Sequence, residues 1–164
     1  MSGDVDNLWM IELSEIDSAI EEMDQATRLR LMATSIEYVM FESPLPLSAL
    51  FPPATTHLLR AAIDVVLTVP GPSPAEVEAL GEELGELSDR VGPAPASMLL
   101  TAMDLLCSVA DGAQVSTVKE VLFSCYDVVM QTQSFGRRIT LEQQTASEIC
   151  LDVIRRQKEL VAGR

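Results

Sequence analysis

Apolar residues recur at every third or fourth position through most of this chain of 164 residues, and no segment shows the convincing apolar and polar alternation of a half-buried strand. Proline and glycine interrupt the pattern at several points, and each interruption predicts a loop between two helices. Aromatic residues make up only 4% of the sequence, so Leu, Val, Ala, Ile and Met must build the core, as they commonly do in helical bundles. The sequence therefore predicts an all-α fold.

The interruptions divide the chain into about seven helices, which short connections would arrange as one antiparallel bundle. The length suits a single domain over residues 1–164, with residues 1–12 as a candidate flexible N-terminal segment. The expected helices are a first carrying Leu13, Ile16, Ile20 and Met23; a second that starts at Asp24 and Thr27; a third over 54–69; a fourth carrying Val77, Leu80, Leu84 and Leu87; a fifth over 96–110, near the centre; a sixth over 114–133; and a seventh from about Thr140.

Charge is distributed unevenly along the chain. Seventeen of the 25 acidic residues lie in residues 1–90 beside only four arginines, so this part carries −13 of the formal net charge of −14. A field of that sign repels nucleic acid and anionic membranes, and it attracts basic protein surfaces. The charge pattern therefore points to a basic protein partner.

Cysteine usage and the N-terminal residues indicate the compartment. Cys107, Cys125 and Cys150 are odd in number and each lies in an apolar stretch, which predicts reduced, buried thiols. The first residues are acidic where a secretory signal starts with positive charge, and no apolar run approaches the length of a membrane span. We expect a cytoplasmic protein that does not bind membranes.

Four aspartates in similar apolar settings, Asp64, Asp104, Asp127 and Asp152, are the pattern closest to a chemical site. Carboxylates from several bundle helices can bind a metal pair, but the usual di-iron pattern also needs Glu-x-x-His ligands, and His57 is the only histidine. Helical spacing places each aspartate on a narrow polar stripe, which favours solvated side chains. We expect no catalytic residue, no metal and no cofactor; a shared carboxylate site remains the alternative.

The only basic concentration also lacks the pattern of a nucleic-acid site. It comprises Arg137, Arg138, Arg155, Arg156 and Lys158. No aromatic residues are interleaved with these side chains, and acidic residues lie in the same predicted helix. The last three are explained by the preference for positive charge at a helix C-terminus. We therefore expect no binding to nucleic acid.

Two acidic blocks and one tryptophan are the candidate partner-binding residues. Runs of acidic residues are usually solvated faces, but the joint imbalance of these blocks exceeds what solubility needs. The candidates are Trp9, Glu12, Glu15, Asp17, Glu21, Glu22, Glu76, Glu78, Glu82, Glu83, Glu86 and Asp89.

Two apolar segments each allow two interpretations. Trp9, the only tryptophan, either packs against the first helix or serves as an aromatic anchor in an interface. The proline-rich segment 43–53 carries Leu45, Leu47, Leu50 and Phe51, which either cover the core or contact a partner. Core cover is favoured, because four exposed apolar side chains would form a large patch.

In its size, its acidic charge, its helical pattern and its lack of a catalytic pattern, this chain resembles the helical immunity proteins of bacterial toxin systems. That resemblance implies tight binding and neutralisation of a cognate toxin. The segments Ala33–Glu37, Thr101–Leu106 and Glu148–Gln157 are also similar to a family of uncharacterised all-helical bacterial proteins, which implies an α-helical fold and assigns no active residues.

The charge leads to a specific expectation. An acidic helical surface centred on Glu76 to Glu86 can enter the basic cleft of a toxin domain, associate quickly through electrostatic steering and exclude the substrate. The alternative is a self-associating structural or adaptor protein, a homodimer built through the apolar loop or an amphipathic helix.

Overall fold

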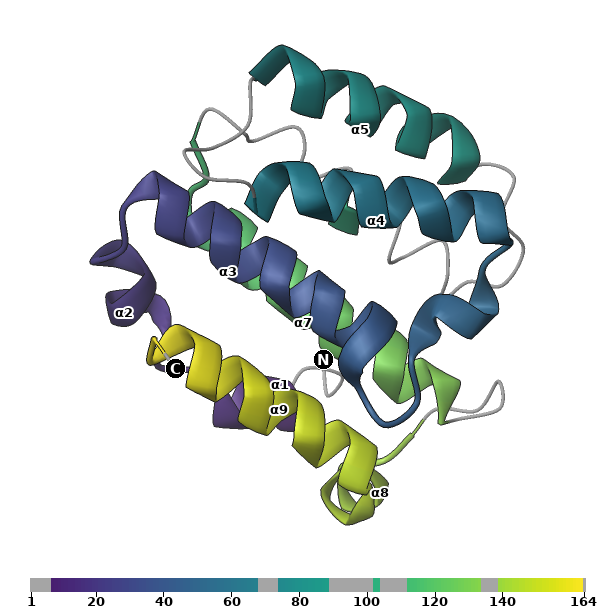
Figure 1. Ribbon diagram of the computed structural model, residues 1–164. Helices are drawn as coiled ribbons and strands as arrows, with labels where there is room; N and C mark the ends of the chain where they lie inside the picture. Colours follow the sequence, from purple (N-terminus) through teal and green to yellow (C-terminus); the bar gives the residue numbers. More distant parts are fainter. Residues whose placement is uncertain (1–6, 68–73, 89–101, 104–111, 134–138, 164) are drawn as a thin grey trace.

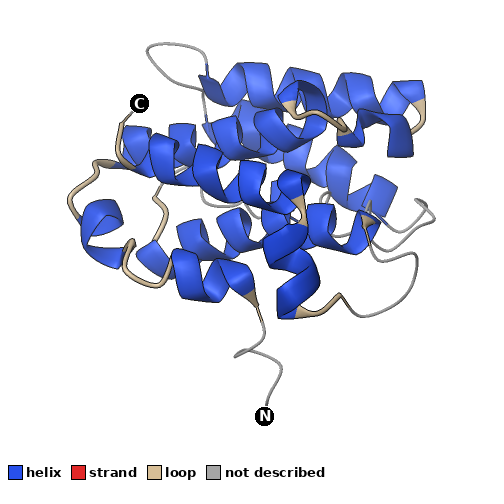
Figure 2. Cartoon of the chain, turned by 90° about the horizontal axis from the view of Figure 1, so that it is seen from below, coloured by secondary structure: helices blue, strands red, loops and turns tan. Residues whose placement is uncertain are grey.

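The computed structural model describes residues 7–67, 74–88, 102–103, 112–133 and 139–163, which form helices joined by turns and loops, without a strand (Figure 1, Figure 2). The expected all-α fold is confirmed. Its α-helices are α1 (Leu8–Glu12), α2 (Asp17–Glu21), α3 (Gln25–Glu37), α4 (Pro53–Leu67), α5 (Pro74–Ser88), α7 (Val115–Thr132), α8 (Leu141–Ala146) and α9 (Glu148–Val161). The predicted fifth helix lies outside the described residues, apart from Ala102 and Met103, which are buried.

Helix α3 lies near the middle of the described fold. The Asp24 side chain accepts a hydrogen bond of 2.7 Å from the backbone nitrogen of Thr27 and thereby caps the helix, as the sequence predicts. Helix α3 packs against α4, α7 and α9, and α4 in turn packs against α5 (Figure 1). Among the described helices, α5 therefore lies at one edge, while α9 lies on the other side of α3.

A π-helix, Tyr38–Glu42, continues α3 and turns two aromatic residues toward different neighbours. The ring of Phe41 lies 4.9 Å from the guanidinium carbon of Arg60 on α4. The hydroxyl group of Tyr38 donates a hydrogen bond to Asp152 on α9. Local π-helical winding is uncommon and frequently occurs at functional sites. Here it links the central helix to α4 and α9.

The N-terminal region differs from the prediction of a single first helix carrying Leu13 to Met23. Asn7 accepts hydrogen bonds from the backbone nitrogens of Trp9 and Met10, so that α1 begins at Leu8. The chain leaves the helix at Leu13 and enters α2 at Asp17. Leu13 and Ile16 are buried even so, because the turn between the two helices directs both side chains into the core. The apolar positions were identified correctly, but the break between them was not.

The C-terminal region forms two helices where the sequence predicts one. Thr140 and Gln143 form a reciprocal capping box that begins α8, in agreement with the predicted start. Ser147 then takes an extended conformation, and its hydroxyl group accepts a hydrogen bond of 3.3 Å from the backbone nitrogen of Cys150, which begins α9. This local cap explains the break, since serine readily satisfies the free amide groups of a new helix.

Branched and unbranched aliphatic side chains form one connected core with Trp9 and Tyr126. Cys125 and Cys150 are buried in it as free thiols, and burial raises the pKa of Cys125 to about 12. Leu47 and Phe51 of the proline-rich segment cover the core, whereas Leu45 remains 57% exposed. No helix in the described ranges is long and apolar enough to cross a membrane.

Candidate protein-binding surface

Some of the acids near the N-terminus form contacts within the fold. Glu12 approaches Lys158 of α9 at 3.4 Å, and Asp17 forms an ion pair of 2.9 Å with Lys119 of α7. Asp24 caps α3, and the hydrogen bonds from Thr27 lower the pKa of its carboxyl group. Glu15, Glu21 and Glu22 remain as exposed acids. Contacts inside the protein thus account for part of the charge that the sequence suggested for a partner.

Trp9 is removed from the candidate surface by its position in the core. Its side chain is only 3% exposed, and its indole nitrogen donates a hydrogen bond of 2.7 Å to Gln157 of α9. The indole also lies edge-on to the ring of Phe123, with 5.3 Å between the ring centroids. Trp9 therefore joins α1 to α7 and α9 and cannot serve as an exposed anchor in this conformation.

The second acidic block lies along α5. Leu84 is fully buried and Leu80 packs against the core, while the glutamates occupy the other sides of the helix. The exposed acids are Glu76, Glu78, Glu82, Glu83 and Glu86, and the helix contains no lysine or arginine. Among the described residues, no ion pair involves these five glutamates. Asp89, the remaining candidate of this block, lies outside the described residues.

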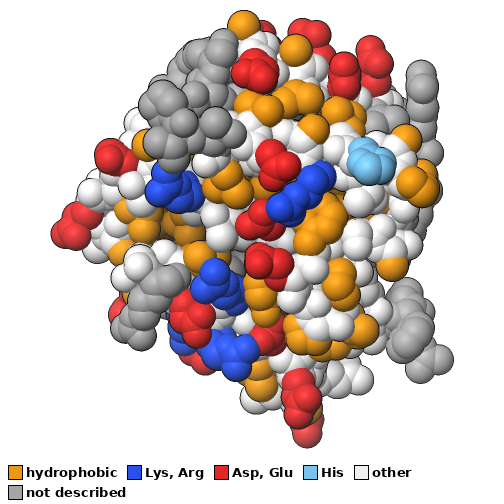
Figure 3. All heavy atoms as spheres, in the orientation of Figure 1, with side chains coloured by type: hydrophobic (Ala, Val, Ile, Leu, Met, Phe, Trp, Pro, Cys, Tyr) orange, Lys and Arg blue, Asp and Glu red, His pale blue; other side chains and the backbone are white. Residues whose placement is uncertain are grey.

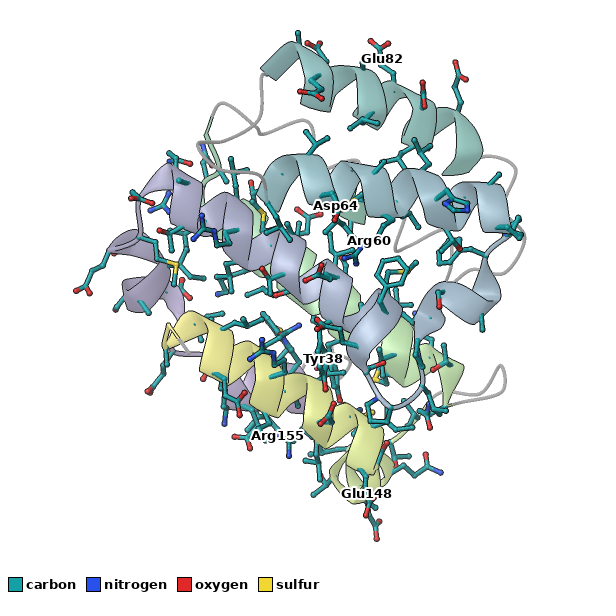
Figure 4. All side chains as sticks on the ribbon, viewed as in Figure 1. Tyr38, Arg60, Asp64, Glu82, Glu148 and Arg155 are labelled. Atoms are coloured by element: carbon teal, nitrogen blue, oxygen red, sulfur yellow. The ribbon has the colours of Figure 1, made fainter. Side chains whose placement is uncertain are left out.

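Like charges lie next to one another on α5. Glu82 follows Glu78 by four residues and precedes Glu86 by four, so the three carboxylates share one side of the helix. Figure 4 shows Glu82 directed away from α4, and Figure 3 shows acidic side chains gathered at this end of the molecule. Such pairs destabilise an isolated helix, and burial of the leucine side must offset the repulsion. Positive charge on a binding partner would relieve this repulsion.

The two acidic blocks do not form one continuous face within the described part of the chain. Helix α5 packs against α4 at one edge, whereas α1 packs against α8, on the far side of α3 (Figure 1). The two blocks, both candidates for partner binding, therefore lie apart in the described fold. The reason is topological: apolar positions on α3 and α4 bury those helices between the two blocks.

Arg60 is the basic residue of α4, the helix that supports α5. Its guanidinium group approaches Glu37 at 3.1 Å and Asp64 at 3.4 Å, and it also covers the ring of Phe41 (Figure 4). Burial raises the pKa of Glu37, while the charge of Arg60 opposes that rise. These contacts direct Arg60 toward α3 and leave the glutamates of α5 as the dominant charge among the described residues at this edge.

Of the four aspartates singled out in the sequence, the three that the structure describes do not assemble into a site. Asp64 pairs with Arg60, Asp127 accepts a hydrogen bond from Gln131, and Asp152 contacts Tyr38 and Arg155. Burial raises the pKa of Asp127. Asp104 lies outside the described residues, and in the part of the chain that is described no group of His, Cys, Asp and Glu could bind a metal ion.

Asp152 departs from the prediction of a solvated stripe, because its side chain is only 13% exposed. It accepts hydrogen bonds from Tyr38 and Arg155, and Arg156 lies 5.9 Å from the centroid of the Tyr38 ring. Burial, followed by the hydrogen bond to Asp152, raises the pKa of Tyr38 to about 12. Sequence spacing did not reveal this cluster, because Tyr38 and Asp152 are 114 residues apart.

Two surface hollows flank the exposed side of α9. One, of about 500 Å³, is bordered by Pro44, Ile149 and Leu151; the other, of about 470 Å³, is bordered by Glu12, Leu151 and Lys158. Arg155 borders both hollows. Leu151 is 40% exposed between them, although it is a large apolar residue. No charge imbalance in the sequence points to this surface, because acids and bases balance along α9.

No protein-family model, curated protein or solved structure matches this chain in comparisons with known proteins.

Proposed function

We propose that this protein is an immunity-type inhibitor that binds a basic toxin domain through the outer side of α5. The observation that carries the proposal is the set of exposed glutamates on a helix with no lysine or arginine, placed at an edge of the fold. Glu76, Glu78, Glu82, Glu83 and Glu86 form this set, called the α5 acidic face below.

Electrostatics supports an inhibitory role for this face. Five carboxylates on one helix create a negative field that steers a cationic surface toward it, and steering raises association rates by factors of about 10 to 1,000. A toxin that acts on nucleic acid or another anionic target needs a basic cleft. An acidic helix bound in that cleft competes with the substrate and excludes it.

Strain within α5 favours the same conclusion. The repulsion between Glu78, Glu82 and Glu86 is unfavourable for the isolated protein, so solubility alone is a poor explanation for that spacing. Lysine or arginine side chains of a partner would convert the repulsion into attraction. Relief of the repulsion that is present in the free protein would then contribute to the affinity for the partner.

The partner must also supply an apolar contact, since affinity from exposed charges alone falls steeply with salt. Trp9 is buried and cannot provide it. The exposed side chains of Ala75 and Ala79, about one turn apart, lie on α5 among the glutamates. An apolar side chain of the partner can pack on this small strip while its basic residues contact the carboxylates on either side.

The test is a pull-down of the tagged protein from its own organism's lysate at low and high salt, followed by mass spectrometry. The wild-type chain should retain one basic protein stoichiometrically, and addition of this inhibitor should abolish the activity of that protein. The variant Glu82→Lys/Glu86→Lys should associate at least about tenfold more slowly while its helicity is unchanged.

The matched control carries the same change of charge away from α5. Glu120 of α7 and Glu142 of α8 are both exposed, so Glu120→Lys/Glu142→Lys should bind at close to the wild-type rate. Equal association rates for the two double variants, or retention of no basic protein, would contradict the proposal.

A further inference from the structure

The exposed side of α9 carries an ordered sequence of acid, apolar residue and base. Glu148, Leu151 and Arg155 lie within about 60° of one another around the helix axis, because each residue advances the helix by about 100°. All three are exposed, and Leu151 stands between the two hollows. Figure 4 shows Glu148 and Arg155 along the outer edge of α9.

This arrangement of acid, apolar residue and base is complementary to the same arrangement on a second copy of α9 that runs in the opposite direction. Along the axis, Glu148 lies about 4.5 Å before Leu151 and Arg155 about 6 Å after it. If two copies of α9 pack antiparallel about Leu151, each Glu148 faces the Arg155 of the other copy, and the two Leu151 side chains meet on the axis. A two-fold interface requires this kind of self-complementary surface.

Helix α9 is electrically balanced within this acidic chain, as is α4 with Arg60 and Asp64, whereas α5 carries five glutamates and no base. Helix α9 contains three acids, Glu148, Asp152 and Glu159, and three bases, Arg155, Arg156 and Lys158, so its net charge is 3 − 3 = 0. Elsewhere the net charge of −14 opposes the approach of a second copy. A second copy that approaches through α9 therefore meets less repulsion than one that approaches through the glutamates of α5.

Exposed apolar surface next to Glu148, Leu151 and Arg155 enlarges the area that a second copy could bury. Leu45, 57% exposed, follows Pro44, which borders the hollow on one side of Leu151. A second copy packed on Leu151 would lie over this hollow, whose rim includes Pro44. Exposed apolar side chains beside a hollow are typical of interaction surfaces.

We infer that the α9 stripe Glu148, Leu151 and Arg155 is a homodimer interface, in which a second copy of this chain packs antiparallel about Leu151. This inference does not depend on the proposed function, because the α5 acidic face lies on the other side of α3 and stays free in the dimer.

The mass of the full chain, measured by sedimentation equilibrium over a range of concentrations, tests the inference. The wild-type chain should reach the mass of a dimer. Leu151→Asp should abolish dimerisation, and Glu148→Arg or Arg155→Glu alone should weaken it at least about tenfold, because each single change creates two like-charge contacts. The double variant Glu148→Arg/Arg155→Glu should recover the dimer, since the exchange restores both pairs.

Cross-linking locates the two-fold axis. Leu151→Cys should form a disulfide-linked dimer under mild oxidation, whereas Glu120→Cys, at an exposed position of α7, should not. Circular dichroism of each variant checks that its helices are intact. A chain that remains monomeric at every concentration, a dimer that survives Leu151→Asp, or an α9 stripe occupied by a different protein would overturn the inference. A folded Glu148→Arg/Arg155→Glu variant that fails to dimerise would also overturn the inference.

Discussion

The indole nitrogen of Trp9 donates a hydrogen bond of 2.7 Å to the side-chain oxygen of Gln157, and thereby ties α1 to α9 across 148 residues of sequence. The amide nitrogen of Gln157 in turn donates to the backbone oxygen of Leu122 on α7, at 2.9 Å. Both side chains are buried, so each loss of a partner leaves a polar atom without water. One glutamine thus joins three helices.

Replacing either partner should destabilise the fold. Trp9→Phe leaves the oxygen of Gln157 without its donor and should cost about 1 to 3 kcal/mol. Gln157→Leu should cost more, because it leaves the indole nitrogen without an acceptor and also removes the additional hydrogen bond to the backbone oxygen of Leu122. The double variant should lose less than the sum of the single losses, since the pair is then absent altogether. Urea denaturation of the four proteins measures this coupling; additive losses would contradict it.

Reversal of one charge on α5 should stabilise the free protein. Glu82→Lys replaces two repulsive pairs, with Glu78 and Glu86, by two attractive ones, and it should raise the free energy of unfolding by about 1 kcal/mol. Thermal denaturation at low salt measures the gain. Added salt should reduce it, because exposed pairs are screened.

Glu120→Lys serves as the control, since no charged residue lies three or four positions from Glu120. If this variant is stabilised as much as Glu82→Lys, overall charge and not repulsion within α5 determines the effect. Slower binding of a basic partner by the more stable Glu82→Lys protein would show that the α5 spacing serves binding at the expense of stability.

Alkaline pH should destabilise this protein through the hydroxyl group of Tyr38 and the thiol of Cys125, whose pKa values are raised in the folded chain. The pKa of Tyr38 is raised from 10.0 to about 12 by burial and the hydrogen bond to Asp152, so between these values the unfolded chain loses a proton that the folded chain retains. Stability is therefore complete below pH 10 and falls as the pH rises toward 12. Cys125, whose pKa burial raises to about 12, acts in the same direction.

Tyr38→Phe isolates one contribution to this alkaline effect. The variant should lose less stability than the wild type when the pH rises from 9 to 11, although it is less stable at neutral pH by about 1 kcal/mol, having lost the hydrogen bond. Urea denaturation at each pH gives both values. Parallel pH profiles for the two proteins would show that Tyr38 ionises equally in the folded and unfolded chains.

Loss of the capping box at Thr140 should loosen both α8 and α1. Thr140→Ala should cost about 1 kcal/mol, and Thr140→Ser should cost less because its hydroxyl group can still cap the helix. Gln144 of α8 accepts hydrogen bonds from the backbone nitrogen of Leu8 and from Tyr126, so fraying of α8 removes support from α1. Hydrogen exchange should be faster in both helices of the alanine variant; faster exchange in α8 alone would refute the link.

The sequence by itself determined the all-α fold, the starts of α3 and α8, and the acidic character of α5. Each depends on local information: the period of the apolar residues, a capping side chain near its own helix, and the charges of one segment. It also identified the burial of Leu13 and Ile16, because apolar side chains leave water whether the intervening backbone is helical or turned.

Only the tertiary structure decided which charges are available and which side chains meet. Helices α3 and α4 separate the two acidic blocks, Lys119 and Lys158 engage acids of the first block, and Trp9 reaches Gln157 in the core. Tyr38 meets Asp152 in the same way, through packing. Contacts between residues so distant in sequence depend on how helices stack, and helical period leaves that choice open, because one apolar face can pack against several different neighbours.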